Sequence, residues 1–153
     1  MAFLSFLNIV ASGMTAQQLR LDVVAENVTN STTTRTEAGG PYRRKMVVFQ
    51  SVAGRDDFRA AMARAAGGLA PNTGASPAGG VRVTQIVEDP SPMKLVYDPA
   101  HPDANEDGYV EMPNVDMVKE MTDAMAATQA YSANVTAFNT LKSVVAKGLE
   151  IGR

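Results

Sequence analysis

Two apolar stripes, one at each end of the chain, constrain its fold more than any other feature. The first stripe advances in alternating steps of three and four residues, interrupted only by Gln17, and its apolar members are Leu7, Val10, Met14, Leu21, Val24 and Val28. This spacing is a seven-residue repeat, which is typical of the seam of a coiled coil or a helix bundle. It predicts a helix over residues 1–30, which the threonines, glycines and proline of residues 30–41 bring to an end.

The second stripe follows the same rule near the other end of the chain. Pro113 stops the extended segment before it, and Asn114, with Asp116 beside it, is expected to cap a helix. The repeat positions that follow are Met117, Met121, Ala124, Thr128, Tyr131, Val135, Phe138, Lys142, Val145 and Leu149. Eight of these ten residues are apolar, so residues 114–153 are predicted to form a second amphipathic helix.

The region between the stripes has the character of short strands. β-branched residues in partial alternation predict strands at 42–50, 81–88 and 94–98. Residues 54–80 are rich in alanine and glycine and predict a long loop. Residues 98–113 are expected to connect the strands to the second helix.

Together these elements predict an α+β fold in three parts. The parts are an N-terminal helix (1–30), a small β-rich region with a long loop (31–113) and a C-terminal helix (114–153). The two helices are expected to form a coiled-coil-like layer. Because an amphipathic helix must bury its apolar stripe, either each terminal helix covers the other or both are buried against other subunits.

The composition argues against several classes of function. A net charge of −2 gives no electrostatic footprint for nucleic acid or an anionic membrane, and no apolar run reaches the roughly 20 residues of a membrane helix. The chain has no cysteine and a single histidine, His101, so we expect no enzyme activity, no cofactor and no small-molecule substrate. The start of the chain has no positive charge before its apolar part, so we expect no cleaved signal peptide.

The stretch DANEDG, residues 103–108, matches the first half of a calcium-binding loop. A complete loop of this kind needs a bidentate glutamate at its twelfth position, where this chain has Asn114. No amphipathic helix precedes Asp103 either. We therefore expect a solvated turn around Gly108, and no metal site.

The two ends of the chain resemble a known family. Residues 11–30, ASGMTAQQLRLDVVAENVTN, are similar to the N-terminal signature of the bacterial flagellar basal-body rod and related axial proteins, including its Asn-hydrophobic-small-Asn ending at 27–30. Residues 32–49, TTTRTEAGGPYRRKMVVF, resemble one proximal-rod subtype, and 108–121 and 130–152 resemble its C-terminal signature. Glu26 and Thr29 depart from the residues usual in the family.

The resemblance implies a structural subunit of the rod, the drive shaft that transmits torque for motility. It implies export through the flagellar type III apparatus and a place in the basal body, where the rod spans the periplasm. The implied partners are further copies of the chain, other rod proteins and a base-ring or export-gate adaptor. The assembly seam then comprises Leu7, Val10, Met14, Leu21, Val24, Asn27, Val28 and Asn30 in the first helix and Met117, Met121, Ala124, Tyr131, Val135, Phe138, Val145 and Leu149 in the second.

Two alternatives stay open at the level of the sequence. One is a calcium-responsive binding module that uses residues 103–114. The other is a folded helical adaptor that never polymerises, in which Met117, Tyr131 and Phe138 pack on the first helix of the same chain. The rod interpretation predicts instead that the terminal helices become stably ordered on assembly, since Gly13 weakens the first helix.

Overall fold

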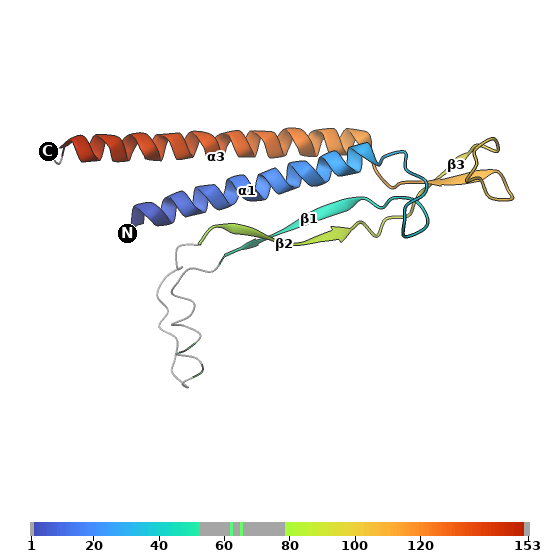
Figure 1. Ribbon diagram of the computed structural model, residues 1–153, viewed down its shortest axis with the longest axis horizontal. Coiled ribbons are helices and arrows are strands. Elements are labelled where there is room, and N and C mark those ends of the chain that lie inside the picture. The colour runs from blue at the N-terminus through green and yellow to red at the C-terminus, as the bar shows by residue number, and fades with distance from the viewer. Residues whose placement is uncertain (1, 53–61, 63–64, 66–78, 152–153) are drawn as a thin grey trace. The chain divides into compact units, whose positions relative to one another are not determined.

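A computed structural model describes residues 2–52, 62, 65 and 79–151. The elements follow one another as α1 (Ala2–Thr29), β1 (Lys45–Ser51), β2 (Val81–Glu88), β3 (Lys94–Tyr97), β4 (Tyr109–Met112) and α3 (Met117–Ile151) (Figure 1). The predicted α+β fold, with a long helix at each end and short strands between, is confirmed. The loop predicted at 54–80 lies almost entirely outside the described residues.

The chain divides into two compact units, and both helices contribute to each of them. The first unit comprises Met1–Ala16, Phe49–Thr84 and Ala130–Arg153. The second unit comprises Gln17–Val48 and Gln85–Gln129. Over the described residues, no helix is long and apolar enough to cross a membrane.

The helix α3 begins at Met117, and the residue that caps it is Asp116. The Asp116 carboxylate accepts the amide N–H of Val118 at 3.1 Å, and its carbonyl accepts the N–H of Glu120 at 3.0 Å. The first bond satisfies an amide that the first helical turn leaves without a partner, and the second is the first hydrogen bond of the helix itself. The prediction that Asn114 caps this helix is wrong, because its side chain is used elsewhere, as described below.

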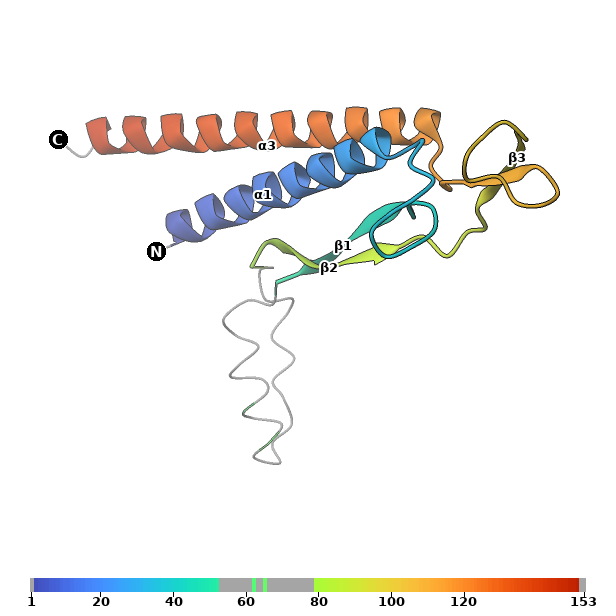
Figure 2. The ribbon, with the colours of Figure 1, turned by 45° about the vertical axis from the view of Figure 1, so that its right-hand side comes forward.

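The four strands form two antiparallel hairpins of two strands each. In the first, the N–H of Asp89 donates to the carbonyl of Arg44 at one end, and the N–H of Val52 donates to the carbonyl of Gly80 at the other. Figure 2 shows β1 and β2 side by side in a second view. In the second hairpin, β3 pairs with β4 in a register that sets Tyr97 opposite Tyr109.

The strand β4 was absent from the sequence prediction. Residues 98–113 were expected to connect the strands to α3, but 98–108 form the loop of the β3–β4 hairpin and Tyr109–Met112 return as a strand. The physical reason is length, because four residues are too few for strand alternation to stand out beside an acidic loop. Val110 is only 2% exposed, so this short strand is anchored through one buried side chain.

The apolar core of the second unit is small and mostly aliphatic. Its residues come from α1, the segment before β1, β4, the segment between β4 and α3, and α3 itself, and they are Val23, Val24, Tyr42, Val110, Val115 and Ala127. Within this unit the end of α1 lies beside the start of α3, as both views show (Figures 1 and 2). The guanidinium of Arg20 donates to Asp123 at 2.8 Å across this contact.

In the first unit, α1 approaches both α3 and the start of β2 closely. A methyl group at Gly13 would lie 3.0 Å from Nδ2 of Asn134, so the glycine permits the close helix contact. Ser12 Oγ donates to the carbonyl of Ile9 at 2.7 Å and accepts the N–H of Val81 at 3.1 Å. One serine hydroxyl therefore fixes the first residue of β2 against α1.

Candidate functional site

Four polar side chains are gathered inside the second unit, and we refer to them as the polar cluster: Asn27, Tyr42, Arg44 and Glu120. Asn27 is 1% exposed and Glu120 is fully buried. Buried polar groups, and buried charges above all, are tolerated only when they are hydrogen-bonded or paired. The cluster meets this requirement with side chains from α1, from the segment before β1 and from α3.

Asn27 uses the whole hydrogen-bonding capacity of its side-chain amide. Its Oδ1 accepts the hydroxyl of Tyr42 and the backbone N–H of Lys45, each at 2.9 Å. Its Nδ2 donates to the carbonyl of Lys45 at 2.9 Å and to Oε2 of Glu120 at 3.0 Å. The amide therefore pairs with the first residue of β1 as a neighbouring strand would, while it also holds α3.

Arg44 is the cation that balances the buried Glu120 carboxylate. Its Nε donates to Oε1 of Glu120 at 2.5 Å, its Nη2 to Asp123 at 3.2 Å, and its Nη1 lies 3.5 Å from Asp89. Burial alone would lower the pKa of Arg44, but the hydrogen bond to Glu120 and the three carboxylates outweigh it and raise that pKa. The Arg44 guanidinium therefore keeps its positive charge beside the Glu120 side chain.

Tyr42 is the remaining member of the polar cluster, and its hydroxyl donates to Asn27. Burial, followed by the negative charges of Glu26, Glu120 and Glu88, raises the pKa of Tyr42 to about 12. The ammonium group of Lys45 lies 5.5 Å from the centre of the Tyr42 ring and pairs with the carboxylate of Glu26. Glu26, which departs from the family pattern, thus takes part in an ion pair.

Asn114 links the cluster to the end of β2. Its Oδ1 accepts the backbone N–H of Arg44 at 2.8 Å, and its Nδ2 donates to the carbonyls of Asp89 and Ser91, each at 3.1 Å. The hydroxyl and backbone N–H of Ser91, and the charge of Arg44, lower the pKa of Asp89 despite some loss of hydration. Lys94 donates to the carbonyl of Val115 at 2.6 Å from the same neighbourhood.

The acidic stretch 103–108 forms the turn that the sequence predicted. Asn105 Oδ1 accepts the amides of Asp107 at 3.2 Å and Tyr109 at 2.8 Å, and Gly108 has a positive φ of 78°. Asp103 accepts the hydroxyl of Thr34 at 2.8 Å, so this carboxylate holds a neighbouring loop. Among the described residues, no group of three or more His, Cys, Asp or Glu side chains could hold a metal ion.

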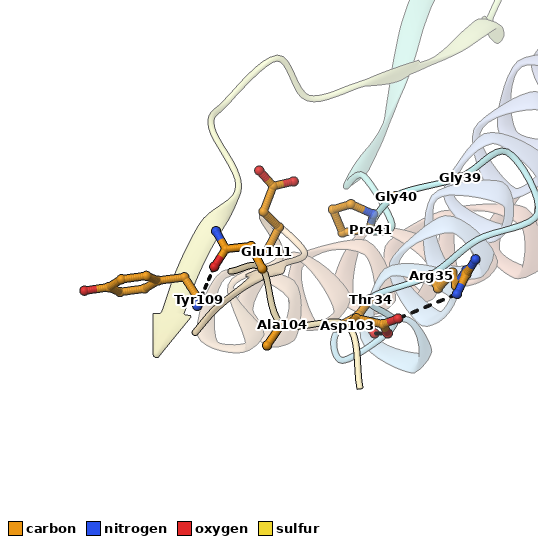
Figure 3. A pocket seen from close by; sticks show the side chains of 10 residues that line it. Thr34, Arg35, Gly39, Gly40, Pro41, Asp103, Ala104, Tyr109 and Glu111 are labelled. Carbon is orange, nitrogen blue, oxygen red and sulfur yellow. Dashed lines mark hydrogen bonds and ion pairs between the residues drawn. The ribbon is translucent and has the colours of Figure 1, made fainter. Parts of the chain in front are cut away.

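An open depression of about 470 Å³ lies between this turn and the loop before β1 (Figure 3). Ten residues line it: Thr34, Arg35, Gly39, Gly40, Pro41, Asp103, Ala104, Asn105, Tyr109 and Glu111. A guanidinium nitrogen of Arg35 lies 3.9 Å from Asp103. The lining combines one cation, Arg35, with two carboxylates, Asp103 and Glu111.

Comparison with known proteins assigns the chain to a family. Residues 7–35 match the model described as flagella basal body rod protein, and residues 106–151 match that of the flagellar basal body rod FlgEFG protein C-terminal region. The flagellar basal-body rod protein FlgC of Bacillus subtilis is 47% identical over 152 residues, which cover 96% of each chain. The chain belongs to the FlgC family of flagellar basal-body rod proteins. FlgC of Borreliella burgdorferi is 42% identical over 99% of this chain and 98% of its own, and FlgC of Escherichia coli O157:H7 is 42% identical over the whole of both.

The two matched segments contain α3 and all but the first residues of α1, and with them every residue of the expected assembly seam. Of the eight expected in the N-terminal part, Val24 and Asn27 are buried, and the other six lie at intermediate exposure: Leu7, Val10, Met14, Leu21, Val28 and Asn30. Asn30 is held by its own helix end, where Nδ2 donates to the carbonyl of Glu26 at 3.0 Å and Oδ1 accepts the hydroxyl of Thr33 at 3.2 Å. The expected α1 seam is therefore already partly covered by the chain itself.

The expected seam residues of α3 fall into two groups that differ in exposure. Ala124, Tyr131, Val135, Phe138 and Val145 are partly covered. Met117, Met121 and Leu149 are exposed by 42%, 59% and 71%.

Sequence reasoning missed the polar cluster apart from Asn27, which the resemblance supplied. In the sequence, Arg44 looks like an ordinary surface charge, and Glu120 lies one position before the expected seam residue Met121. It also missed Val118 and Met125, which are exposed by 72% and 65%. A signal was present, because Met121 is flanked at three and four residues by Val118 and Met125, and such spacing places all three on one helical face.

Proposed function

We propose that this FlgC-family chain is a structural subunit of the proximal rod, which polymerises through its terminal helices into the torque-transmitting shaft. The names of its relatives, shared over nearly the whole length of the chain, support a place in the flagellar basal body. The role is structural and involves no catalysis. A rod subunit must present surfaces that a neighbouring subunit covers, and α3 carries such a surface.

The observation that carries the proposal is an exposed apolar strip at the start of α3. Val118, Met121 and Met125 are each more than half exposed, and Met117 is exposed at its edge. Methionine side chains are flexible and polarisable, so they adapt well to a partner surface. An exposed apolar strip of this kind indicates a contact with another subunit.

The expected seam residues then fall into two roles. Met117, Met121 and Leu149 contact neighbouring subunits directly, because the chain itself leaves them exposed. The partly covered residues of both helices complete their burial in the assembly. Contacts between different surfaces of successive subunits need not close on themselves, and they build an open filament.

The resemblance to the family extends this proposal to partners and export. The proposed partners are further copies of the chain, other rod proteins and a base-ring or export-gate adaptor, and the proposed export route is the flagellar type III apparatus. The subunit then lies in the rod as it spans the periplasm. Passage in an unfolded form requires that the terminal helices gain their full stability only on assembly. Strong protection of residues 5–28 against hydrogen exchange in the free subunit would contradict this last point.

The experiment that tests the function is deletion of the gene in its host, with swimming and isolated basal bodies examined together. We expect truncated basal bodies and no swimming, both restored by a plasmid copy. A copy with Met121→Lys should fail to restore rods, while Ala126→Lys, which places the same charge at an exposed position of α3 outside the strip, should restore them. Intact rods in the deletion strain would refute the proposal and favour a helical adaptor that never polymerises.

A further inference from the structure

The β3–β4 hairpin presents an exposed face that the chain itself leaves uncovered. Leu95 and Tyr97 are each 64% exposed, and Tyr109 is 43% exposed. The register sets Leu95 opposite Glu111 and Tyr97 opposite Tyr109, so these four side chains share one face of the hairpin. We call them the hairpin face. Three large apolar side chains on four neighbouring positions are more than the scattered exposure of an ordinary surface.

The two tyrosines of this face are held in place. Their ring centroids are 5.2 Å apart with an angle of 65° between the planes, which is an edge-to-face contact. The Tyr97 ring also lies against Gly108, where an added methyl group would come within 3.0 Å of it. Rigid, exposed aromatic side chains lose little conformational entropy on binding, and they are typical of the centre of protein interfaces.

The face continues into the depression of Figure 3. Tyr109 and Glu111 belong to both, and Pro41 and Ala104 add apolar walls. Within the described part of the chain, no cation pairs with the carboxylate of Glu111. The surface therefore offers apolar area beside one negative charge that has no cation partner, next to an open depression.

The charge of the hairpin indicates which kind of partner fits. Residues 94–112 contain one lysine and five carboxylates, whereas the whole chain has a net charge of only −2, so the remainder of the chain is net positive. Complementary charge favours encounter and sets the register of an interface. A second copy of the chain can therefore supply a basic surface for the hairpin face.

The end of α3 is the part of a second copy that matches. From Lys142 to Glu150 every residue except Val145 is exposed, so this part of the helix has little cover within its own chain. Val144 is 62% exposed, and Lys147 follows it by three residues on the same side of the helix. Such a pair is spaced by about 5–6 Å, close to the roughly 5 Å between the cross-strand neighbours Leu95 and Glu111.

We propose that the hairpin face of one subunit docks on the end of α3 of a second copy. In this contact Lys147 pairs with Glu111, and Val144 packs on the apolar side chains beside it. The contact joins two different surfaces of the chain, as a heterologous interface does. This inference rests on the proposed function as a polymerising subunit and names one of its contacts.

A charge-reversal cycle on the full chain tests this contact. Sedimentation velocity at low salt measures self-association of the wild type, Glu111→Lys, Lys147→Glu and the double variant. We expect each single reversal to weaken self-association by about tenfold or more, and the double variant to recover it. The recovered pair is also expected to weaken at about 0.5 M salt, since exposed charges are screened there.

Matched variants exclude a general effect of charge. Glu37→Lys and Lys119→Glu make the same changes at other exposed positions, and they should associate like the wild type. The inference is overturned if the wild type does not self-associate, if neither single reversal weakens association, or if the double variant does not recover it. Failure of this contact can be distinguished from failure of the proposed rod function. If a wild-type copy restores rods in the deletion strain, the rod function is supported whatever sedimentation shows.

Discussion

Asn27 and Glu120 lie 93 positions apart in the sequence and share a hydrogen bond of 3.0 Å, in which the side-chain amide donates to the carboxylate. The same amide accepts from Tyr42 and Lys45, and the same carboxylate accepts from Arg44. One bond therefore joins two sets of contacts, one at the end of α1 and one at the start of α3. An asparagine at the end of α1 is needed because it alone offers two donors and two acceptors on one short side chain.

Removing the Glu120 carboxylate should be costly. In Glu120→Ala the Arg44 guanidinium and the Asn27 amide lose their buried acceptor, and we expect a loss of about 3–5 kcal/mol in the free energy of unfolding. Urea unfolding followed by circular dichroism measures it. The matched control is Glu106→Ala, at an exposed position of the hairpin loop, which should change stability by less than about 0.5 kcal/mol. Equal effects in the two variants would show that Glu120 does not organise the unit.

The helices could be predicted from the sequence because their signal is local. A seven-residue repeat places every apolar residue on one face without knowledge of what covers it. The polar cluster could not be predicted, because Glu120 looks like a surface charge until Arg44 is known to lie beside it, 76 positions away in the sequence. The exposure of Val118 could not be predicted either, because a periodic pattern does not say which apolar face of a helix the chain itself covers.

Deprotonation of Tyr42 should destabilise the fold at high pH. The pKa of Tyr42 is raised to about 12 in the folded state, against about 10 in an unfolded chain. The contribution of Tyr42 to the stability of the fold is complete below about pH 10, where the folded and unfolded states both hold the phenol proton. This contribution is lost as the pH rises from about 10 to about 12, because in that range only the unfolded state has released the proton.

The melting temperature measured at several values between pH 9 and pH 12 should therefore fall more steeply for the wild type than for Tyr42→Phe. The variant itself should lose about 1 kcal/mol at neutral pH, because Asn27 loses a hydrogen-bond donor. The absorbance of tyrosinate offers an independent measurement, since the component that titrates near pH 12 should be missing from Tyr42→Phe. Parallel curves for the two proteins would contradict the assignment.

Gly80 should tolerate no side chain. Its φ is +107°, and an added methyl group would lie 2.3 Å from Oγ of Ser12, whose hydroxyl is committed to Ile9 and Val81. Gly80→Ala should cost about 1–3 kcal/mol and remove the hydrogen-exchange protection of the Val81 amide. In Gly148→Ala, by contrast, nothing lies within 4 Å, and the helix should gain about 1 kcal/mol.

A double-mutant cycle separates the clash from the backbone strain at Gly80. In Ser12→Ala the nearest obstructing oxygen is gone, so adding Gly80→Ala should cost less than it does in the wild type. The remaining cost then reports the positive φ together with the close approach to the Cβ of residue 12, at 3.2 Å. Strict additivity of the two substitutions would mean that the serine does not hold the start of β2 against α1.

Gly108 should be required for the order of the two tyrosines on the hairpin face. Its φ is +78°, and an added methyl group would meet the Tyr97 ring at 3.0 Å and Pro99 at 3.2 Å. Gly39 has a similar φ of +85° but open space around the added group, so Gly39→Ala isolates the backbone strain. We expect Gly108→Ala to reduce the near-ultraviolet circular dichroism of the tyrosines and to cost about 1 kcal/mol more than Gly39→Ala. If both variants keep the wild-type spectrum, the Tyr97–Tyr109 contact does not depend on the turn, and the rigidity assigned to the hairpin face must come from another source.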